Sequence, residues 1–288
     1  MPKKEIKKET STIKRQPRPG LESTMKPKPI SKDNKKPSGK LFNKVAVITG
    51  GDSGIGKAVA LLFAKEGADI AIIYLNEHSD AEEVKNTIEE NYDRNCLNIP
   101  GDITNEDFCK KAIDKVLDEY GRIDILVNNA AIHFESKSLD DITTPHLIKT
   151  FETNVYSIFW LSKYAVPYMK RGGSIINSAS VVAYRGSAHL MDYAATKGAI
   201  VAFTKSLAFN LVDKGIRVNG VAPGPIYTPL IVSSFEPEKA AKHGTQVPMK
   251  RAGEPVEVAP SYLFLASTDS SYMTGQFLHP NGGEIINS

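Results

Sequence analysis

Short apolar runs recur along the chain from about residue 41 onward, each four to six residues long and most of them rich in Val and Ile. Runs of this length between turn residues are typical of buried strands, and none is long enough to span a bilayer. The pattern predicts seven strands, at Val45–Thr49, Ile70–Leu75, Leu97–Pro100, Ile123–Asn128, Gly173–Ser178, Arg217–Ala222 and Gln276–His279.

Segments with helical spacing separate these strands. Gly56–Glu66, for example, places Val59, Leu62 and Phe63 on one face, and Gly67 then ends the helix. The other predicted helices are Ala81–Glu90, Glu106–Tyr120, a long region from Leu147 to Met169, Tyr193–Val212 and Glu257–Ala266. Strands that alternate with amphipathic helices indicate a parallel sheet covered on both faces. We therefore expect an α/β fold, a doubly wound parallel sheet of the Rossmann type in a single domain.

The first 40 residues differ in composition from the rest of the chain. They hold thirteen Lys or Arg, four Asp or Glu and six of the seventeen prolines. This composition predicts a disordered or loosely docked basic arm at residues 1–40, ahead of a domain at 41–288. We expect residues 1–15 to be mobile. Residues 16–40 should lie along the domain or a neighbouring subunit, with Leu21, Met25 and Ile30 as anchors.

The net charge is +3, of which the arm carries +9 and the domain therefore −6. So small a total gives no reason to expect a nucleic-acid partner, and the arm lacks the aromatic residues of a stacking platform. An arm that tethers the protein to a polyanion is the alternative. No apolar signal segment follows the basic start, and two cysteines, Cys96 and Cys109, are too few for a disulfide framework. We expect a cytoplasmic protein without membrane contact.

A glycine-rich turn lies between the first predicted strand and the first helix. Residues 49–56 read T-G-G-D-S-G-I-G, which places Gly50, Gly54 and Gly56 in the pattern G-x-x-x-G-x-G. Glycines let the backbone approach a pyrophosphate, and the free N–H groups of a helix start favour an anion. The turn predicts a dinucleotide site, with a turn that binds nothing as the alternative. No Lys-Ser/Thr pair follows the last glycine, which disfavours an ATPase.

Tyr193 and Lys197 stand four residues apart near the start of a predicted helix and therefore share one face. A lysine ammonium, helped by an oxidised nicotinamide, should lower the pKa of Tyr193 toward neutral pH and suit it to acid–base catalysis. Ser180 lies just past the strand predicted at Gly173–Ser178, at the sheet edge where open α/β folds bind ligands. Y-x-x-x-K pairs are common in amphipathic helices, so their occurrence together with the glycine turn carries the prediction.

From about Leu41 to the C-terminus the sequence resembles the classical short-chain dehydrogenases/reductases. The motifs of that family are matched by Thr49–Gly56, by Asn128–Ala131 for N-N-A-G, by Asn154, by Ser180 thirteen residues before Tyr193, by Lys197, and by Pro223-Gly224. The resemblance implies an oxidoreductase that transfers a hydride between NAD(P) and an alcohol or carbonyl substrate. Its catalytic groups would be Asn154, Ser180, Tyr193 and Lys197, with Tyr193 as general acid and base.

The resemblance also implies roles around the cofactor. Asn154 would hold a water that links Lys197 to solvent, Asp102 would contact the adenine, and Ile226 and Thr228 would contact the carboxamide. Ala131 replaces the usual glycine, which narrows the cleft without removing a catalytic group. The implied cofactor-binding residues are Gly50, Asp52, Ser53, Gly54, Ile55, Gly56, Tyr74, Asp102, Ile103, Asn128, Ala130, Lys197, Pro223, Gly224, Ile226 and Thr228.

A closer similarity is to a bacterial subgroup with a Pro-rich N-terminal arm, matched by Gln16–Ile30. Its members are described as oxidoreductases, and some as aldehyde reductases. The alternative function is a non-catalytic dinucleotide-binding regulator, and the complete Ser–Tyr–Lys–Asn set argues against it.

The second predicted strand bears on the choice of cofactor. Tyr74 ends that strand where NAD-selective members of the family place an aspartate, so their contact to the ribose is missing. However, no Arg or Lys between Gly67 and Val84 is available for a 2′-phosphate, and Ser53 stands where many NADP-binding members have a basic residue. Glu77 would repel a phosphate. We expect NAD to be slightly favoured over NADP, with dual use as the alternative.

Three further features complete the expectations. His133, His189 and His243 fit no metal-ligand spacing, so we expect no metal, and His189 is placed at the substrate pocket because it precedes Tyr193 by one turn. Residues 229–255 are polar, proline-bearing and predicted to form an irregular lid over the substrate. The helices near 147–169 and 193–212 carry apolar residues on several faces. In the resembling family these two helices join subunits, which implies a homotetramer.

Overall fold

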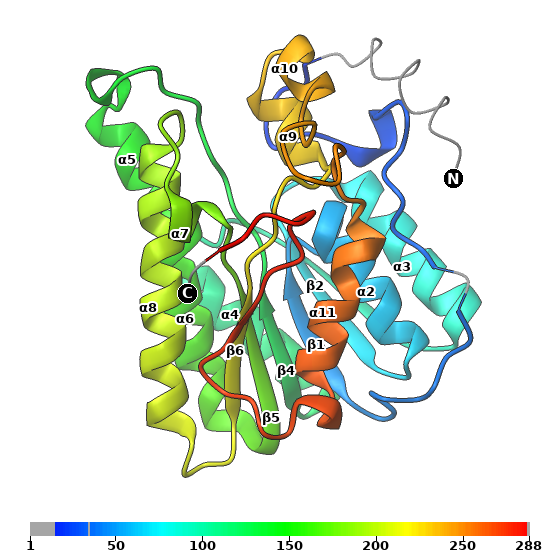
Figure 1. The fold of residues 1–288 in the computed structure, drawn as a ribbon. Helices are drawn as coiled ribbons and strands as arrows, with labels where there is room; N and C mark the ends of the chain where they lie inside the picture. The colour runs from blue at the N-terminus through cyan, green and yellow to red at the C-terminus, as the bar shows by residue number, and fades with distance from the viewer. Residues whose placement is uncertain (1–14, 34, 287–288) are drawn as a thin grey trace.

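The computed structural model describes residues 15–33 and 35–286, and its centre is one parallel sheet of seven strands (Figure 1). The strand order is β3-β2-β1-β4-β5-β6-β7, so the chain winds from the middle to one edge and then from the middle to the other. This confirms the predicted doubly wound sheet. The strands are β1 Val45–Thr49, β2 Asp69–Tyr74, β3 Cys96–Pro100, β4 Ile123–Asn128, β5 Met169–Ser178, β6 Arg217–Val221 and β7 Phe277–Leu278.

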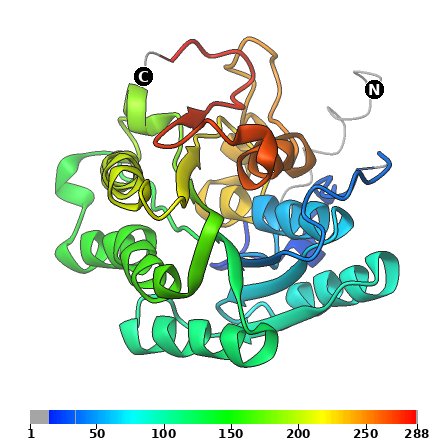
Figure 2. The same ribbon diagram turned by 90° about the horizontal axis from the view of Figure 1, so that it is seen from below.

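Helices cover both faces of the sheet (Figure 2). One face carries α2 Gly54–Lys65, α3 His78–Tyr92 and α11 Pro255–Ala266, and the other carries α4 Glu106–Tyr120, α6 Ser157–Ala165 and α8 Met191–Leu211. Along β1, Ala46 and Ile48 face the first layer, and Val45 and Val47 face the second. Because both faces are covered, every residue of β1 is buried, which explains why the strand is a continuous apolar run in the sequence.

The long helix predicted from Leu147 to Met169 is divided in the structure. It consists of α5 Thr144–Phe151, the π-helical turn η4 Glu152–Tyr156, α6 and the 3₁₀ turn η5 Val166–Tyr168. The predicted helical region is therefore confirmed up to Tyr168, with its regular period interrupted at the centre, and Met169 already belongs to β5. A π turn holds an extra residue that a 3.6-residue period does not reveal, and such turns often occur at functional positions. Asn154 lies in this turn.

The segment predicted as an irregular lid contains two short helices, α9 Pro229–Ser234 and α10 Pro237–Ala241. The expectation of wholly irregular structure is therefore wrong. A proline begins each helix, where its fixed φ suits the first turn and its missing N–H leaves no hydrogen bond unmade. Of the four prolines that suggested an irregular chain, Pro229, Pro237 and Pro255 begin helices and Pro248 lies in a turn.

Residues 15–33 and 35–40 lie against the domain, near α9 and α10 and then along α3 (Figure 1). Of the three expected anchors only Met25 is buried, with 3% of its surface exposed, while Leu21 and Ile30 are 37% and 36% exposed. Met25 packs with Tyr227 and Val232 in a small apolar cluster. Leu21 and Ile30 are therefore wrong as side-chain anchors. The expectation for residues 1–15 falls almost entirely on residues 1–14, which lie outside the described chain.

Polar contacts, more than apolar ones, hold the described arm. The Ile30 carbonyl accepts a hydrogen bond from Val256 N at 2.9 Å, and the Ile30 N–H donates to Glu254 Oε2 at 2.8 Å. The short turn η2 Glu22–Thr24 contacts α3. The pattern of apolar residues in the sequence does not predict such hydrogen bonds. Within the described residues, no helix has the length and apolar character needed to cross a membrane, and Cys96 and Cys109 are buried free thiols.

Candidate active site

A cleft of about 390 Å³ opens along the carboxyl ends of the strands. On one side of the β1–β4 pair, Tyr74 ends β2 and Asp102 follows β3. On the other side, Ser180 follows β5 and Pro223 follows β6. The predicted site residues that line the cleft are Gly50, Asp52, Ser53, Gly54, Ile55, Tyr74, Asp102, Ile103, Ala130, Ser180, Tyr193, Lys197, Pro223, Gly224, Ile226 and Thr228. Gly56, Asn128 and Asn154 do not line it; they lie behind its wall.

The glycine turn needs its glycines for two different reasons. Gly50 and Gly54 have φ of +61° and +53°, a conformation that side chains with a Cβ rarely adopt. Gly56 packs so tightly that a Cβ on it would stand 1.9 Å from the Gly50 carbonyl oxygen. Gly56 thus lets α2 approach the turn, while Gly50 and Gly54 shape the backbone that faces the cleft.

Glu22, from the arm, reaches the start of α2. Its Oε2 accepts a hydrogen bond from Gly54 N at 2.6 Å, and its Oε1 is 2.9 Å from Lys57 Nζ. The Glu22 backbone is held in turn by Asp80, whose Oδ2 accepts from Glu22 N at 2.7 Å. Burial raises the pKa of Glu22, and the Lys57 charge opposes that shift. Nothing in the sequence pattern pointed to Glu22, because the contact joins residues 32 positions apart.

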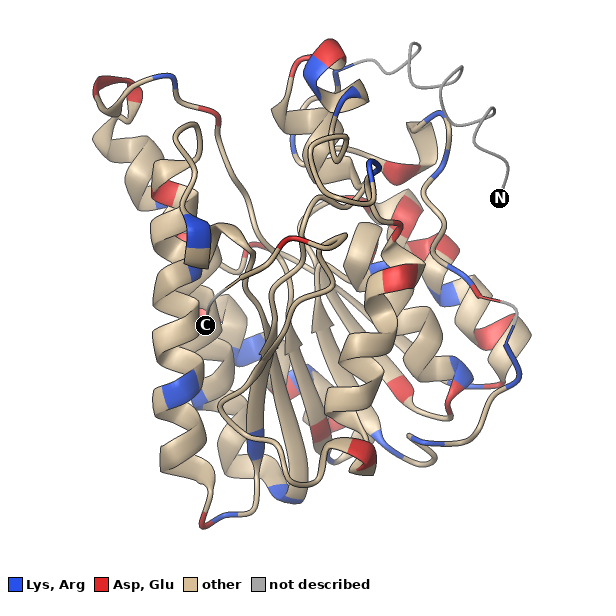
Figure 3. Ribbon diagram, viewed as in Figure 1, with Lys and Arg blue, Asp and Glu red and all other residues tan. Residues whose placement is uncertain are grey.

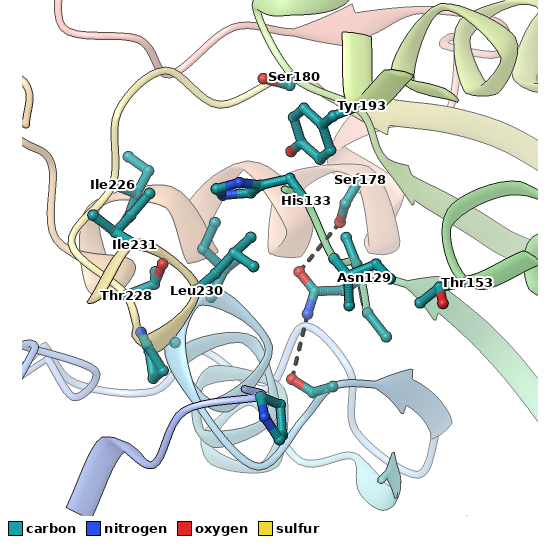
Figure 4. Close-up of a pocket in the computed structure, with 18 of the residues that line it drawn as sticks. Asn129, His133, Thr153, Ser178, Ser180, Tyr193, Ile226, Thr228, Leu230 and Ile231 are labelled. Carbon is teal, nitrogen blue, oxygen red and sulfur yellow. Dashed lines mark hydrogen bonds between the residues drawn. The ribbon is translucent and has the colours of Figure 1, made fainter. Parts of the chain in front are cut away.

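The N-N-A segment after β4 is bound to the glycine turn. Asn129 Nδ2 donates to the carbonyl oxygens of Thr49 and Gly50, and Thr49 Oγ1 accepts from Asn129 N and Ala130 N. Figure 4 shows Asn129 between the turn and Ser178, whose hydroxyl donates to Asn129 Oδ1 at 3.3 Å. These contacts fix the floor of the cleft.

Asn128 supports the cleft from inside the sheet. Its Nδ2 donates to Asn177 Oδ1 at 2.9 Å, across the β4–β5 pair, and Asn177 Nδ2 donates to Thr204 Oγ1 on α8. The side chain therefore points away from the cleft, and any effect on a ligand passes through the strands and α8.

Tyr193, Lys197 and Ser180 meet at one place, as the spacing predicts. Lys197 Nζ lies 5.3 Å from the centre of the Tyr193 ring and donates to the Ser178 carbonyl at 2.7 Å. Burial raises the pKa of Tyr193 to about 12, opposed only in part by the Ser180 hydroxyl, and burial lowers the pKa of Lys197 to about 7. In the protein by itself, burial disfavours both charges. The lowering of the Tyr193 pKa that the sequence predicts also requires an oxidised nicotinamide beside the ring, and it stays a prediction.

Asn154 positions the loop that follows β4. Its Oδ1 accepts from Ile132 N, and its Nδ2 donates to the Ile132 carbonyl, both at 2.9 Å. A second hydrogen bond from Nδ2 reaches Thr196 Oγ1 on α8 at 3.1 Å. The side-chain amide thus joins the π turn, α8 and the next residues of the cleft wall.

Carboxylates dominate the end of the cleft near β2. Asp52 is buried, and its pKa is raised to about 7, first by burial and then by the charge of Glu77. The Tyr74 hydroxyl is 3.0 Å from His78 Nδ1. Asp102 accepts from Thr104 and lies 3.3 Å from Lys149 Nζ, and these partners lower its pKa despite partial burial.

The opposite end of the cleft contains residues that the sequence patterns did not select. His133, Leu230, Ile231, Phe235 and His243 line it beside Tyr193, and Figure 4 shows His133 next to that tyrosine. Phe235 belongs to residues 229–255, the segment predicted as a lid. His189 is exposed and does not line the cleft, so its expected place at the substrate pocket is wrong. No cluster of metal-ligating side chains occurs in the described chain.

Known proteins resemble this chain in sequence and in structure. A family model described as enoyl-(acyl carrier protein) reductase matches residues 50–284. The crystal structure of a short-chain dehydrogenase from Burkholderia cenocepacia in complex with NADP is 33% identical, with a TM-score of 0.80 over 85% of this chain and 98% of that one. The chain belongs to the short-chain dehydrogenase/reductase family.

Two similar members of the short-chain dehydrogenase/reductase family match more of the chain than that structure does. An uncharacterized oxidoreductase of Bacillus subtilis, YhdF, is 55% identical over 94% of this chain and 93% of its own. The chloroplastic NADPH-dependent aldehyde reductase 1 of Arabidopsis thaliana is 52% identical over 96% of this chain and 98% of its own. The similarity therefore extends beyond bacteria.

Proposed function

We propose that the chain is an NAD(P)-dependent oxidoreductase that transfers a hydride between the nicotinamide and an alcohol, aldehyde or ketone. One observation carries the proposal: Tyr193, Lys197 and Ser180 meet in the same cleft that begins at the glycine turn. The aldehyde reductase among its relatives, and its membership of a family of dehydrogenases and reductases, support the same reaction.

The cleft fits a dinucleotide. Glycines at 50 and 54 leave the start of α2 without side chains that would fill the space over it. The residues that would hold the cofactor are those of the glycine turn and Tyr74 at one end, and Ile226, Thr228 and Lys197 at the other. When bound, the nicotinamide would supply or accept the hydride.

Tyr193 would act as the general acid in reduction. With a pKa near 12 its hydroxyl keeps its proton at neutral pH and can donate it to a carbonyl oxygen, which the Ser180 hydroxyl would also hold. Lys197, with a pKa near 7, would exchange a proton at the same place. Asn154 is a positioning residue, and a relay water would bind its backbone carbonyl or the second lone pair of Oδ1, because both Nδ2 hydrogens are already donated.

We favour NAD over NADP for this chain. Asp52 and Glu77 lie at the end of the cleft near β2, where negative charge disfavours a 2′-phosphate. Similar proteins are described with NADP, with NADPH and with NADH, so the preference for NAD rests on the carboxylates of this chain. Parallel binding titrations with NADH and NADPH test the preference for NAD. Tighter binding of NADPH than of NADH would refute it.

We also propose an oligomeric state and a cellular location for the protein. Exposed aromatic side chains on α6 and α8 support a homotetramer joined through these helices. Two buried free thiols suit a reducing cytoplasm. Residues 1–40 are proposed as an arm that docks on a domain formed by residues 41–288. Residues 229–255 are proposed as a lid, because α9 and α10 line or adjoin the cleft.

The function is tested with purified protein, both cofactors and a panel of aldehydes, ketones, sugars and alcohols. We expect Tyr193→Phe to lower kcat by about 10²–10⁴-fold, because the proton donor is lost, while the cofactor Kd stays nearly unchanged. Tyr168→Phe is the matched control, since that half-exposed ring lies outside the cleft. Turnover by Tyr193→Phe within a factor of two of wild type would refute the assignment. Cofactor binding without any turnover would favour the regulator.

A further inference from the structure

Four rings follow one another from the proposed proton donor into the lid. The ring centres of Tyr193 and His133 are 5.2 Å apart, those of His133 and Phe235 are also 5.2 Å apart, and those of Phe235 and His243 are 6.1 Å apart. All four residues line the cleft. His133 therefore stands between the general acid and the lid, where the part of a substrate beyond its reacting carbon has to lie.

The two imidazoles have unused hydrogen-bonding capacity. His133 Nδ1 and His243 Nε2 are buried and have no partner among the described residues. Buried polar atoms are rarely left unpaired, so each calls for a partner that the described chain does not supply. A neutral imidazole offers one donor and one acceptor, and a hydroxyl group can satisfy either.

The backbone around His133 is held on three sides. Its carbonyl oxygen accepts from Arg18 Nη2 of the arm at 3.1 Å and from Ser234 Oγ of α9 at 3.4 Å. The preceding residue, Ile132, is bound at both its N–H and its carbonyl by Asn154. These contacts hold the backbone that carries the imidazole, and the Tyr193 and Phe235 rings flank the buried imidazole itself, which is the support that recognition of a substrate atom requires.

The charge state of this region limits what it can bind. Burial lowers the pKa of His133 to about 3 and that of His243 to about 4, and nearby cations act in the same direction. Both rings are neutral at physiological pH and give no ionic attraction to a carboxylate or phosphate. Arg185, which lines the cleft, is 3.3 Å from Glu284 and is already paired. Leu230 and Ile231 add apolar wall.

We propose that His133, with His243 behind it, forms a hydroxyl-binding subsite beside the reacting carbon, so that the preferred substrates are uncharged hydroxyaldehydes, hydroxyketones or polyols. The inference rests on the proposed oxidoreductase function. His133 binds a hydroxyl on the carbon next to the carbonyl, while Tyr193 protonates the carbonyl oxygen. An alkyl aldehyde of the same length leaves the His133 ring unpaired and is reduced less efficiently.

The test compares lactaldehyde with propanal, which differ by one hydroxyl next to the carbonyl. Wild type should reduce lactaldehyde with a kcat/KM about tenfold or more above that of propanal. In His133→Phe this ratio should fall close to one, and in His133→Asn, which keeps a donor and an acceptor, part of it should remain. Damage to folding or to cofactor binding lowers both rates together and leaves the ratio intact, so the ratio reports the subsite alone.

His189→Phe is the matched control, because this histidine is exposed and outside the cleft, and the ratio should not change. A wild-type ratio near one, or a ratio that survives His133→Phe, overturns the subsite while the oxidoreductase function stands. Reduction of other panel carbonyls without reduction of lactaldehyde has the same meaning. If no carbonyl compound or alcohol in the panel reacts with either cofactor, the proposed function fails together with the subsite.

Discussion

Burial controls the charge of the side chains along the cleft. Tyr193 has a pKa near 12, Lys197 near 7 and His133 near 3, and burial is the largest cause in each case. Each shift favours the neutral form of its group. The cleft therefore presents a neutral phenol and neutral imidazoles to a substrate, together with a lysine that titrates close to neutral pH. This set is suited to proton transfer with uncharged molecules.

The raised pKa of Asp52 predicts that the stability of the protein depends on pH. Its pKa rises from 3.8 to about 7 on folding, so between these values the native state holds a proton that the unfolded state has released. The free energy of unfolding therefore falls as pH rises through this window, and the loss is complete above pH 7. We expect Asp52→Asn to gain stability relative to wild type from pH 4 to 7, with a constant difference above.

Thermal unfolding at several pH values measures this difference. Asp140→Asn makes the same chemical change on an exposed turn and provides the control. A stability difference between Asp52→Asn and wild type that does not vary with pH would show that Asp52 is ionised in the native protein at neutral pH. The carboxylate contribution to cofactor preference would then be larger than the Asp52 pKa implies.

The basic arm contacts the start of α2 through an acidic residue, Glu22, which its composition does not predict. Glu22 carries a negative charge from a basic segment to the N–H groups at the start of α2, where the helix dipole favours an anion. Lys57 pairs with it, and both side chains are buried. Removal of one member of a buried pair leaves the other charge uncompensated, which commonly costs about 3–5 kcal/mol. The arm is thus joined to the glycine turn that it passes.

Deletion of residues 1–40 should therefore lower the melting temperature, whereas deletion of residues 1–15 should not. The shorter deletion removes only one described residue, Arg15, whose ion pair with Glu236 is exposed and contributes little. The longer deletion removes Met25 and Glu22 from buried positions. Differential scanning calorimetry of both truncated proteins makes the comparison.

Glu22→Gln in the full chain isolates the buried pair, and Ser23→Ala on the exposed neighbouring position is its control. We expect a lower melting temperature for Glu22→Gln alone. Equal melting temperatures for wild type and the 1–40 deletion would mean that the arm contributes no stability, contrary to the contacts described above.

For the whole molecule, the charges of the arm and the domain are complementary. Acidic side chains gather on α3, where the arm passes (Figure 3). Lys28 lies 4.0 Å from Glu83 on α3, and Arg15 and Lys40 pair with Glu236 and Asp269. Three of the thirteen cations of the arm are therefore opposed by acids of the domain itself.

The surface of α6 and α8 leads to the prediction about assembly. Phe159 on α6 stacks on Phe203 of α8 with ring centres 3.9 Å apart, and about half of Phe159 remains exposed. Phe209, further along α8, is 84% exposed. Large exposed aromatic groups on adjacent helices are typical of an interface. We expect a homotetramer at micromolar concentration, measured by light scattering, and a smaller species for Phe209→Asp.

Phe42→Asp is the control, because Phe42 is also largely exposed but lies before β1, away from these helices. A monomeric mass for the wild type would refute the assembly. A mass that Phe209→Asp does not change would place the interface elsewhere.

The sequence alone determined the features that depend on neighbouring residues. Strand runs, helix periods and the glycine turn are local, so the sheet, most of its helices and the cofactor end of the cleft could be predicted. The spacing of Tyr193 and Lys197 is also local, since four residues make about one helical turn. Ser180 followed from its place at a strand end and from a family motif.

Tertiary structure decided the features that depend on segments distant in sequence. The pKa of Tyr193 is set by what covers it, and no spacing rule contains that information. Glu22 contacts the start of α2 because the arm packs there. His133 and His243 line the cleft because the chain around them, including residues 229–255, packs beside Tyr193. The arm is held largely by polar contacts, which leave no hydrophobic pattern, so its course could not be predicted from apolar anchors. Local sequence thus specified the scaffold, and long-range packing specified the protonation states and the residues that line the cleft beside Tyr193.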